Sequence, residues 1–539
     1  VNKIDLLKTR RAKLLEAGKN VREKIAALTD ECSFVELDAY SFSHNDFYGE
    51  DAEGEGVVTG YATINDEPVY IVAQNPDVLS GGISEGNCKK IRKCLNKALA
   101  AQKPVVYLFD SLGVRIGEGV NVLEGIAEVL AAADDLKGEV PQISVVTGEL
   151  YGSFAVLAAN ADFNLMTKSA SVAYASPFVI SAKSDKNVDK TEVGGVKASA
   201  FNSVATVEVA DMADAKEKIA DILSILPACS EIVADTDDDL NRATEGLNEK
   251  VCGKCIVKSV FDDGKFVEMN AAFHPEVKTG IGRIGGISAA AIVFDDGDDG
   301  VELDLGNVSK LKEFAYFAAD NGLPLVTFVN TLGIKADMQT SNTAILKEIG
   351  HLVSGLKCCE RISVVTKKAI GLGYSLFASK SIGNEYAYAF ANAKIALFDG
   401  AASAAAFGDF KVADTDKLAE KYAEENADPI NAARNGYIDN IIEPQFVRAY
   451  VVSALQTVLA DELMTELGKI QKEYHLPIQS HLSENFGERA ASGGFTFLLG
   501  MIVIFAGMTI LVLCVTGFGK IAEAIAKKAE KKSEKTEKP

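Results

Sequence analysis

The sequence predicts an α/β protein of two similar halves, each built on a mainly parallel sheet, with one apolar helix near the C-terminal end. Three observations predict this: blocks that recur about 220 residues apart, short apolar strands that alternate with helices, and an uncharged stretch at 495–518. Because 539 residues exceed what one ordinary hydrophobic core accommodates, at least two large domains are expected.

Three blocks of the first half recur in the second half in the same order. PVVYLFDSLGVR at 104–115 matches PLVTFVNTLGIK at 324–335, an offset of 220 residues. The other two matches are GNCKKI at 86–91 with GNVSKL at 306–311, and ISVVT at 143–147 with ISVVT at 362–366. Blocks that repeat in order at a nearly constant offset predict two halves with one shared fold.

Each half repeats one rhythm of strand, glycine loop and helix. Apolar strands are expected at 105–109 and 143–146, and again at 325–329 and 362–365, each followed by a glycine-bearing loop. Alternating short strands and helices indicate a parallel sheet with covering helices, and ligands bind at the carboxyl ends of such strands. Because the first amides of a helix are unpaired donors, two converging loops are suited to hold an oxyanion, such as the enolate oxygen of a thioester.

Composition and missing motifs exclude several classes of function. The net charge of −21 argues against a general nucleic-acid binder, which needs clustered Lys and Arg. The sequence has neither a GxxxxGK[ST] phosphate loop nor a GxSxG nucleophile elbow, and its five histidines are scattered. We interpret Cys252, Cys255, Cys358 and Cys359 as reduced thiols rather than a disulfide framework, and we expect no metal site.

The C-terminal region is read as a membrane anchor. Residues 495–518, FTFLLGMIVIFAGMTILVLCVTGF, carry no charge and are long enough to span a bilayer as a helix. They follow a Ser-Gly-Gly hinge at 492–494 and precede a Lys-rich tail at 519–539. We expect one membrane span, whose orientation the flanking charges leave open.

The segments at 56–65, 110–115, 192–197 and 371–374 resemble motifs of the biotin-dependent acyl-CoA carboxyltransferases, the β-type subunits of acetyl- and propionyl-CoA carboxylases. Methylmalonyl-CoA and glutaconyl-CoA decarboxylases contain the same type of subunit. Residues 56–65, GVVTGYATIN, resemble the opening of this family, and 110–115, DSLGVR, resemble its DSGGAR loop. Residues 192–197, EVGGVK, and 371–374, GLGY, resemble two further glycine segments. The resemblance covers about residues 1–475.

The resemblance implies two tandem crotonase-like (ClpP/crotonase) domains related by internal duplication, with the active site between protomers of a homo-oligomer. The first domain, expected at 1–228, binds acyl-CoA, and the second, at 229–478, binds biotin. A linker at 479–494, the transmembrane helix at 495–518 and the tail at 519–539 complete the expected organisation.

The resemblance also assigns roles to backbone groups. It needs no side-chain nucleophile, because biotin stripped of its carboxyl group serves as the base. The amides expected to stabilise the thioester oxyanion are those of Val114, Gly152 and Ser153. The amides expected to stabilise the biotin oxygen are those of Gly333, Leu372 and Gly373. The further residues expected to bind the CoA ester or biotin are Gly113, Arg115, Gly194, Gly195, Gly371 and Tyr374.

Four features depart from the family pattern. Leu112 stands where the family usually has Gly, and Ser153 replaces the second Gly of a glycine pair. Ser199 occupies a position where the family often has His, and SNTAI at 341–345 replaces a glycine-rich helix start. These departures bear on substrate choice.

The partners follow from what the chain lacks. It has no MKM biotinyl-lysine motif, so biotin is expected on a separate carrier, the biotin carboxyl carrier protein. The segment LGMIVIF at 499–505 resembles the small γ-type subunit of sodium-pumping decarboxylases, which work with a polytopic membrane subunit.

We therefore predict the carboxyltransferase subunit of a membrane-associated, sodium-translocating decarboxylase that acts on a malonyl-, methylmalonyl- or glutaconyl-type CoA ester. The expected location is the cell membrane, with a single span and the catalytic domains on the cytoplasmic side. Two alternatives stay open: a carboxyltransferase subunit of an acetyl- or propionyl-CoA carboxylase, and a non-catalytic scaffold that keeps the fold.

Overall fold

A computed structural model describes residues 2–473, apart from 185, 296, 298, 342–343, 400–402 and 407–413. The chain divides into two compact units, Val1–Val458 and Leu459–Pro539, and the fold described here is that of the first unit. Among the described residues, no helix is both long and apolar enough to cross a membrane. The expected linker at 479–494, span at 495–518 and tail at 519–539 lie outside the described residues.

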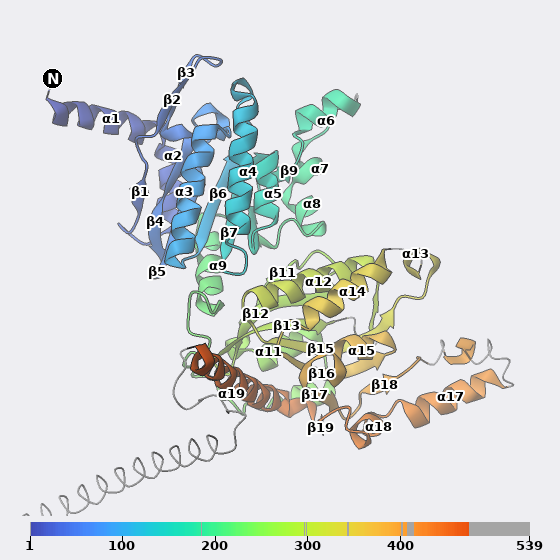
Figure 1. Ribbon diagram of the computed structural model, residues 1–539. Coiled ribbons are helices and arrows are strands. Elements are labelled where there is room, and N and C mark those ends of the chain that lie inside the picture. Colours follow the sequence, from blue (N-terminus) through green and yellow to red (C-terminus); the bar gives the residue numbers. More distant parts are fainter. Residues whose placement is uncertain are drawn as a thin grey trace, which may run out of the picture. The chain divides into compact units, whose positions relative to one another are not determined.

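The first half of the chain forms an eight-stranded sheet (Figure 1). Its path is β1 (Val35–Leu37), β4 (Val57–Ile64), β5 (Glu67–Gln74), β6 (Val105–Ser111), β7 (Gln142–Tyr151), β8 (Phe163–Thr167) and β10 (Val207–Val209), and β9 (Ser171–Ala173) pairs with β7. The β1–β4 and β4–β5 pairs are antiparallel, whereas the strands from β5 to β10 are parallel. A separate hairpin joins β2 (Phe42–Asn45) and β3 (Glu50–Glu53).

The second half forms a nine-stranded sheet with the same arrangement. Its path is β11 (Val267–Met269), β12 (Val277–Ile284), β13 (Ile287–Phe294), β15 (Leu325–Ile334), β16 (Arg361–Ile370), β17 (Asn384–Phe390) and β19 (Asn440–Ile442). Outside this path, β14 (Val301–Leu303) pairs with β15 and β18 (Lys394–Ala396) pairs with β16. The four strands predicted from the apolar runs are confirmed as parts of β6, β7, β15 and β16, and the parallel pairing of β6 with β7 and of β15 with β16 is confirmed as well.

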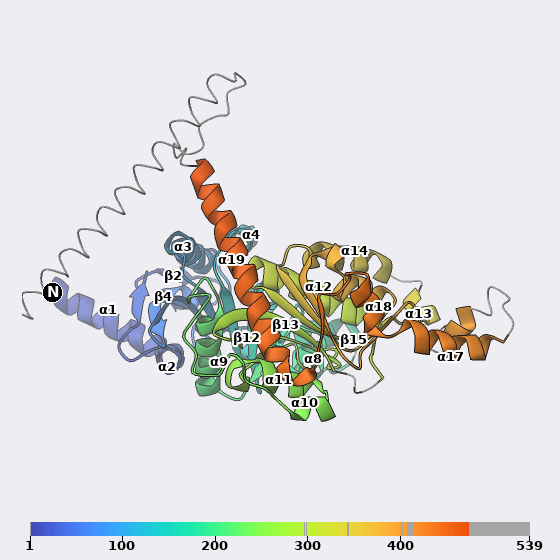
Figure 2. The same cartoon turned by 90° about the horizontal axis from the view of Figure 1, so that it is seen from below.

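Helices cover the sheets, and α12 and α14 lie side by side on the second one (Figure 1; Figure 2). The first-half helices are α1 (Lys3–Ala17), α2 (Lys19–Leu28), α3 (Glu85–Ala101), α4 (Val120–Asp134), α5 (Ser153–Ala159), α6 (Pro177–Ser184), α7 (Lys190–Gly194), α8 (Val196–Phe201) and α9 (Met212–Ile225). The second-half helices are α10 (Gly246–Glu249), α11 (Gly253–Val260), α12 (Leu305–Asp320), α13 (Met338–Ser341), α14 (Ile345–Leu356), α15 (Leu372–Phe377), α17 (Thr415–Asn426), α18 (Pro429–Arg434) and α19 (Val447–Glu473).

Strand β6 shows why the central strands are continuously apolar. Val106 and Leu108 lie in one buried cluster, while Val105, Tyr107 and Phe109 lie in another. Successive side chains of a strand point to opposite faces, so both faces of this sheet are packed. Such a sheet gives the loops at its carboxyl edge a rigid base.

The repeated Gly-Asn pair begins α3 and α12 in the same way. A Cβ on Gly86 would lie 2.7 Å from Cδ of Glu55, and a Cβ on Gly306 would overlap the ring of His274. The following Asn87 donates its side-chain amide to the Glu55 carbonyl at 3.2 Å. Glycine at this position thus lets a side chain from the preceding segment pack against the first turn of each helix.

A buried lysine repeats one turn further along each helix. The Lys90 ammonium donates to the carbonyls of Gly54 and Val57, at 3.0 and 2.5 Å. Lys310, its equivalent 220 residues later, donates to four carbonyls, those of Asn270, Phe273, His274 and Val277. Burial lowers the pKa of each lysine to about 8. These ammonium groups fix the segment that enters β4 or β12.

The cysteine interpretation was partly wrong. Cys252 and Cys255 are joined by a disulfide, because their spacing across the first turn of α11 brings their Cα atoms to 5.0 Å, within the range that the bond requires. Cys358 and Cys359 are free thiols, as interpreted, the first exposed and the second buried.

Candidate active site

The two glycine loops of the first half lie against each other at the carboxyl edge of the sheet. Gly113 follows β6 with φ of 117°, and Gly152 follows β7 with φ of 87°, so both adopt conformations that favour glycine. A Cβ on Gly152 would lie 3.9 Å from the Cα of Gly113. The Gly152 loop leads directly into α5, which begins at Ser153.

Two of the three amides expected at this site are available as donors. Within the described part of the chain, the backbone N–H groups of Val114 and Ser153 donate no hydrogen bond. The N–H of Gly152, by contrast, donates to the carbonyls of Ala173 and Tyr174, at 3.2 and 3.0 Å. Gly152 is therefore anchored to the end of β9 and to the residue after it, and it shapes the loop rather than offering a donor. Sequence reasoning missed the next amide, that of Phe154, which has no acceptor among the described residues either.

The second half repeats this arrangement at β15 and β16. Gly333 has φ of 88° and Gly371 has φ of 53°. A Cβ on Gly333 would lie 3.8 Å from the Leu372 nitrogen and 3.5 Å from the Gly373 nitrogen. Because residue 333 has no side chain, the space in front of these two amides stays open.

Leu372 and Gly373 are the available donors of the second half. Neither N–H has an acceptor among the described residues. The Gly371 N–H donates to the Ala396 carbonyl at 2.9 Å, which parallels the anchoring of Gly152. The Gly333 N–H donates to Oγ1 of Thr331 at 3.0 Å, so this expected donor is engaged within the chain.

The offset of 219 residues that relates β7 to β16 aligns the two sites. It pairs Ser153 with Leu372 and Phe154 with Gly373, the first two residues of α5 and of α15. By this offset the second-half donors Leu372 and Gly373 correspond to Ser153 and Phe154, whereas the sequence prediction named Gly152 and Ser153. Applying the offset to Gly373 would have identified Phe154 from the sequence.

A pocket of about 360 Å³ lies beside the first-half loop. Its lining includes Tyr48, Ser80, Leu112, Gly113 and Val114. The side chain of Leu112 is 55% exposed and lines this pocket, so the departure from Gly at this position changes the shape of the pocket. Tyr48 is held there because its hydroxyl accepts the Ile116 N–H at 3.2 Å.

Arg115 anchors the loop that carries Val114. Its side chain is 1% exposed and pairs with the buried Glu55 carboxylate at 3.2 Å. It also donates to the Glu55 carbonyl at 3.0 Å. This buried ion pair between Arg115 and Glu55 holds the loop in place.

The glycine pair at 194–195 supports the Gly152 loop from the other side. A Cβ on Gly194 would overlap the backbone of Val172 in β9, and Gly195 forms an isolated bridge with Ser171. Ser199, at the family's histidine position, is buried and donates to the Gly194 carbonyl at 2.9 Å. These residues position β9, whose carbonyl at Ala173 anchors Gly152.

Two further side chains complete the description of the loops. Tyr374, expected to bind a cofactor, lies in the first turn of α15, and burial raises the pKa of its hydroxyl. Lys24 was not identified from the sequence; its ammonium donates to Asp110 at 3.0 Å and to Thr147 at 2.9 Å. Lys24 thereby joins the ends of β6 and β7, and no sequence motif marks it.

The fold and the glycine loops define the class of protein. It is an α/β protein in which two neighbouring backbone N–H groups can bind an oxygen at the start of α5 and, equivalently, at the start of α15. Comparison with known proteins gives the family. The family described as "Carboxyl transferase domain" matches residues 14–469. The methylmalonyl-CoA decarboxylase subunit alpha of Veillonella parvula is 30% identical over 484 residues, covering 84% of this chain and 95% of the relative.

Two further similar proteins support the same family. The propionyl-CoA carboxylase carboxyltransferase subunit of Haloferax mediterranei is 28% identical over 495 residues, covering 84% of this chain and 96% of the relative. The structure of the transcarboxylase 12S hexamer, with methylmalonyl-coenzyme A and methylmalonic acid bound, superposes with a TM-score of 0.78 at 25% identity, covering 85% of this chain and 95% of the other. The chain belongs to the carboxyl transferase family and is a biotin-dependent acyl-CoA carboxyltransferase.

The residues present fit the two groups that this family uses, a CoA ester as substrate and biotin held by a separate carrier. A thioester and the cyclic urea of biotin each present a carbonyl oxygen, which needs hydrogen-bond donors. Ser153 and Phe154 on one side, and Leu372 and Gly373 on the other, are such donors without acceptors among the described residues. The space left by Gly333 lets an oxygen approach the second pair.

Proposed function

We propose that this chain is the carboxyltransferase subunit of a biotin-dependent acyl-CoA decarboxylase. It removes the carboxyl group of a malonyl-, methylmalonyl- or glutaconyl-type CoA ester and passes it to biotin on the carrier. The observation that carries this proposal is the pair of equivalent amide sites, at Ser153 and Phe154 and at Leu372 and Gly373.

The first-half amides act on the CoA ester. When the bond between the α-carbon and the carboxylate breaks, the electron pair moves onto the thioester oxygen. The N–H groups of Val114 and Ser153, with that of Phe154, stabilise this developing charge, and the preceding glycines keep them in place. Biotin, when bound, supplies the nitrogen that takes up the carboxyl group. The amides of Leu372 and Gly373 would hold its ureido oxygen.

The proposed assembly follows the family. Two crotonase-like domains, at 1–228 and 229–478, form a site between protomers of a homo-oligomer. Figure 1 is consistent with two halves of similar build, since the two sheets share one strand order. The partners are a biotin carboxyl carrier protein and a polytopic membrane decarboxylase subunit.

The membrane part of the proposal rests on sequence. Residues 495–518 would anchor the chain by a single span, with the catalytic domains on the cytoplasmic side. The polytopic partner subunit would couple decarboxylation to sodium transport. The likeness to a methylmalonyl-CoA decarboxylase subunit supports the decarboxylase choice.

The test uses the detergent-purified full chain with free biotin and, separately, malonyl-CoA, methylmalonyl-CoA and glutaconyl-CoA. Mass spectrometry follows the biotin-dependent appearance of the decarboxylated ester. Product from one ester would support the proposal and name the substrate. A folded chain that neither forms product nor binds CoA would refute the proposal. The non-catalytic scaffold would then be the remaining interpretation.

A carboxylase subunit is the second candidate, favoured by the likeness to a propionyl-CoA carboxylase carboxyltransferase subunit. Isolation of the native complex distinguishes the carboxylase candidate from the decarboxylase candidate. Co-purification of a biotin carboxylase would favour the carboxylase, whereas co-purification of a polytopic membrane protein, with sodium uptake by reconstituted vesicles, would favour the decarboxylase.

A further inference from the structure

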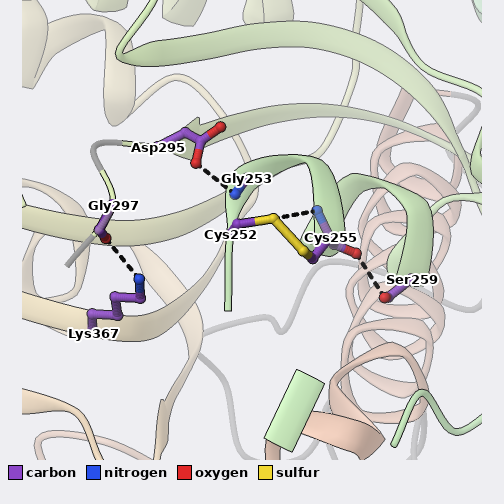
Figure 3. The surroundings of a disulfide bond; sticks show 7 residues. All are labelled: Cys252, Gly253, Cys255, Ser259, Asp295, Gly297 and Lys367. Atoms are coloured by element: carbon purple, nitrogen blue, oxygen red, sulfur yellow. Dashed lines mark hydrogen bonds between the residues drawn. A yellow bond between two sulfur atoms is a disulfide. The ribbon is translucent and has the colours of Figure 1, made fainter. Parts of the chain in front are cut away.

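The disulfide between Cys252 and Cys255 is unlike the other sulfur groups of the described chain (Figure 3). Cys88, Cys94 and Cys359 are buried thiols, and desolvation raises the pKa of each to about 12. Such thiols stay protonated and unreactive. Both bonded cysteines, by contrast, are only partly buried, so a reagent in solution can reach them.

The two sulfurs occupy different environments at the start of α11. Cys252 is the residue that caps this eight-residue helix, and its Sγ accepts the N–H of Cys255 at 3.2 Å. Backbone N–H groups and the positive end of a helix stabilise a thiolate. Cys252 also lines a pocket of about 530 Å³, together with Lys250, Thr366, Lys367 and Phe390. An incoming thiol therefore has room to approach Cys252.

The start of α11 is also held to a loop that leads to the biotin-side site. The Gly253 N–H donates to the Asp295 carboxylate at 2.7 Å. Two residues later the Gly297 carbonyl accepts the Lys367 ammonium at 2.7 Å, as Figure 3 shows. This loop enters β14, whose Glu302 pairs with Gly333. The disulfide-bearing turn is thus hydrogen-bonded to Asp295, which precedes β14 in the chain.

We propose that Cys252 and Cys255 form a thiol–disulfide exchange site for a dithiol, and that the closed disulfide holds the first turn of α11 against Asp295. One thiolate of the dithiol attacks Cys252 Sγ, the disulfide breaks, and Cys255 leaves as a thiolate and takes a proton. The second thiolate of the dithiol then attacks the first sulfur of the dithiol, which is bonded to Cys252 Sγ in the mixed disulfide. This releases Cys252 as a thiolate next to the Cys255 N–H. Two electrons pass from the dithiol, which becomes a cyclic disulfide, to the cysteine pair.

The first experiment measures exchange in the full chain. The chain is equilibrated with mixtures of dithiothreitol and oxidised dithiothreitol, alkylated, and mapped by mass spectrometry, while near-UV circular dichroism monitors folding. We expect the peptide with Cys252 and Cys255 to change reversibly from protected to doubly alkylated without loss of the native spectrum. Cys358, which is exposed and unbonded, serves as the internal control and should be alkylated in every mixture. Double alkylation even in oxidised dithiothreitol, or opening only on unfolding, would overturn the exchange site.

The order of attack has its own test. Cys255→Ser leaves Cys252 without its partner, so oxidised glutathione should form a stable mixed disulfide with it. The matched variant Cys252→Ser should form several-fold less, because Cys255 lacks the pocket and the N–H contact. Equal adducts on both variants would contradict the role given to Cys252.

The link to Asp295 is tested by hydrogen exchange. Reduction should raise amide exchange several-fold in the first turn of α11 and at Asp295. The double variant Cys252→Ser with Cys255→Ser should match the reduced chain, and Cys358→Ser should match the oxidised chain. Unchanged exchange on reduction would show that the disulfide does not hold the first turn of α11 against Asp295.

Discussion

The two halves of the chain build the same amide site with different supports. In the first half, the loop after β6 is anchored by the buried pair of Arg115 and Glu55. In the second half, Lys335 stands at the position of Arg115, but its side chain is 46% exposed and pairs with Asp337 at 3.2 Å. The glycines and free amides repeat, whereas the buried ion pair behind the first loop does not. Backbone geometry is thus what both sites require, and side chains are free to differ around it.

The largest expected difference between the halves concerns these cations. Arg115→Ala leaves the Glu55 carboxylate buried without its partner, which is expected to cost about 3–5 kcal/mol of unfolding free energy. Lys335→Ala removes an exposed pair and should cost close to nothing. Urea denaturation followed by circular dichroism measures both. Equal losses would show that the supports do not differ as described.

The buried lysines provide a second comparison. Lys310→Met removes four hydrogen bonds from a charged donor and Lys90→Met removes two, and each such bond contributes about 1.5–3 kcal/mol. The Lys310 variant should therefore be the less stable one. Denaturation of both variants at pH 7 checks the order, and a more stable Lys310→Met would contradict it.

These lysines also make a prediction about pH. The pKa of Lys90 and of Lys310 falls from 10.5 to about 8 on folding. Between these values the unfolded state binds more protons, so this contribution makes stability rise with pH from about 8 to 10.5 and leaves it constant below. The rise should be smaller in each Met variant than in the parent chain. An identical pH dependence would show that the lysines are not perturbed by burial.

The smallest effect is expected at the hydroxyls that bind the loop glycines. Thr331 accepts the Gly333 N–H and donates to the Val301 carbonyl at 2.7 Å, whereas Ser111 accepts the Gly113 N–H at 3.2 Å. Thr331→Val should cost about 1–2 kcal/mol and Ser111→Ala less than about 1. Thermal unfolding of the two variants measures the difference. A larger loss for Ser111→Ala would reverse the comparison.

The sequence predicted the parts of this structure that depend on local pattern. Apolar runs and repeated blocks located the parallel strands. The family resemblance, rather than a local pattern, pointed to Ser153, Leu372 and Gly373, whose N–H groups have no acceptor among the described residues. Hydrogen bonds that engage particular amides could not be read in this way. Gly152 is engaged by the carbonyl of Ala173, and Gly333 is engaged by the Thr331 hydroxyl, whose rotamer the sequence does not reveal.

Long-range charge contacts escaped the sequence for the same reason. Lys24 reaches Asp110 across 86 positions of the chain, and Arg115 reaches Glu55 across 60. Neither pair follows a periodicity or a motif. The disulfide of Cys252 was missed because the same spacing also occurs in reduced thiols, and only the helix start brings the two sulfurs together.

One measurement tests most directly whether the backbone amides at the two helix starts carry the chemistry. Ser153→Pro and Leu372→Pro each remove one N–H at the first position of a helix, where proline is tolerated. The rate of biotin-dependent decarboxylation of the CoA ester is compared with that of Ser153→Ala and Leu372→Ala, which keep the N–H. The account predicts a fall in kcat of about 10²–10³-fold for each proline variant and a far smaller fall for each alanine variant. Folded proline variants that retain the parent rate would contradict it.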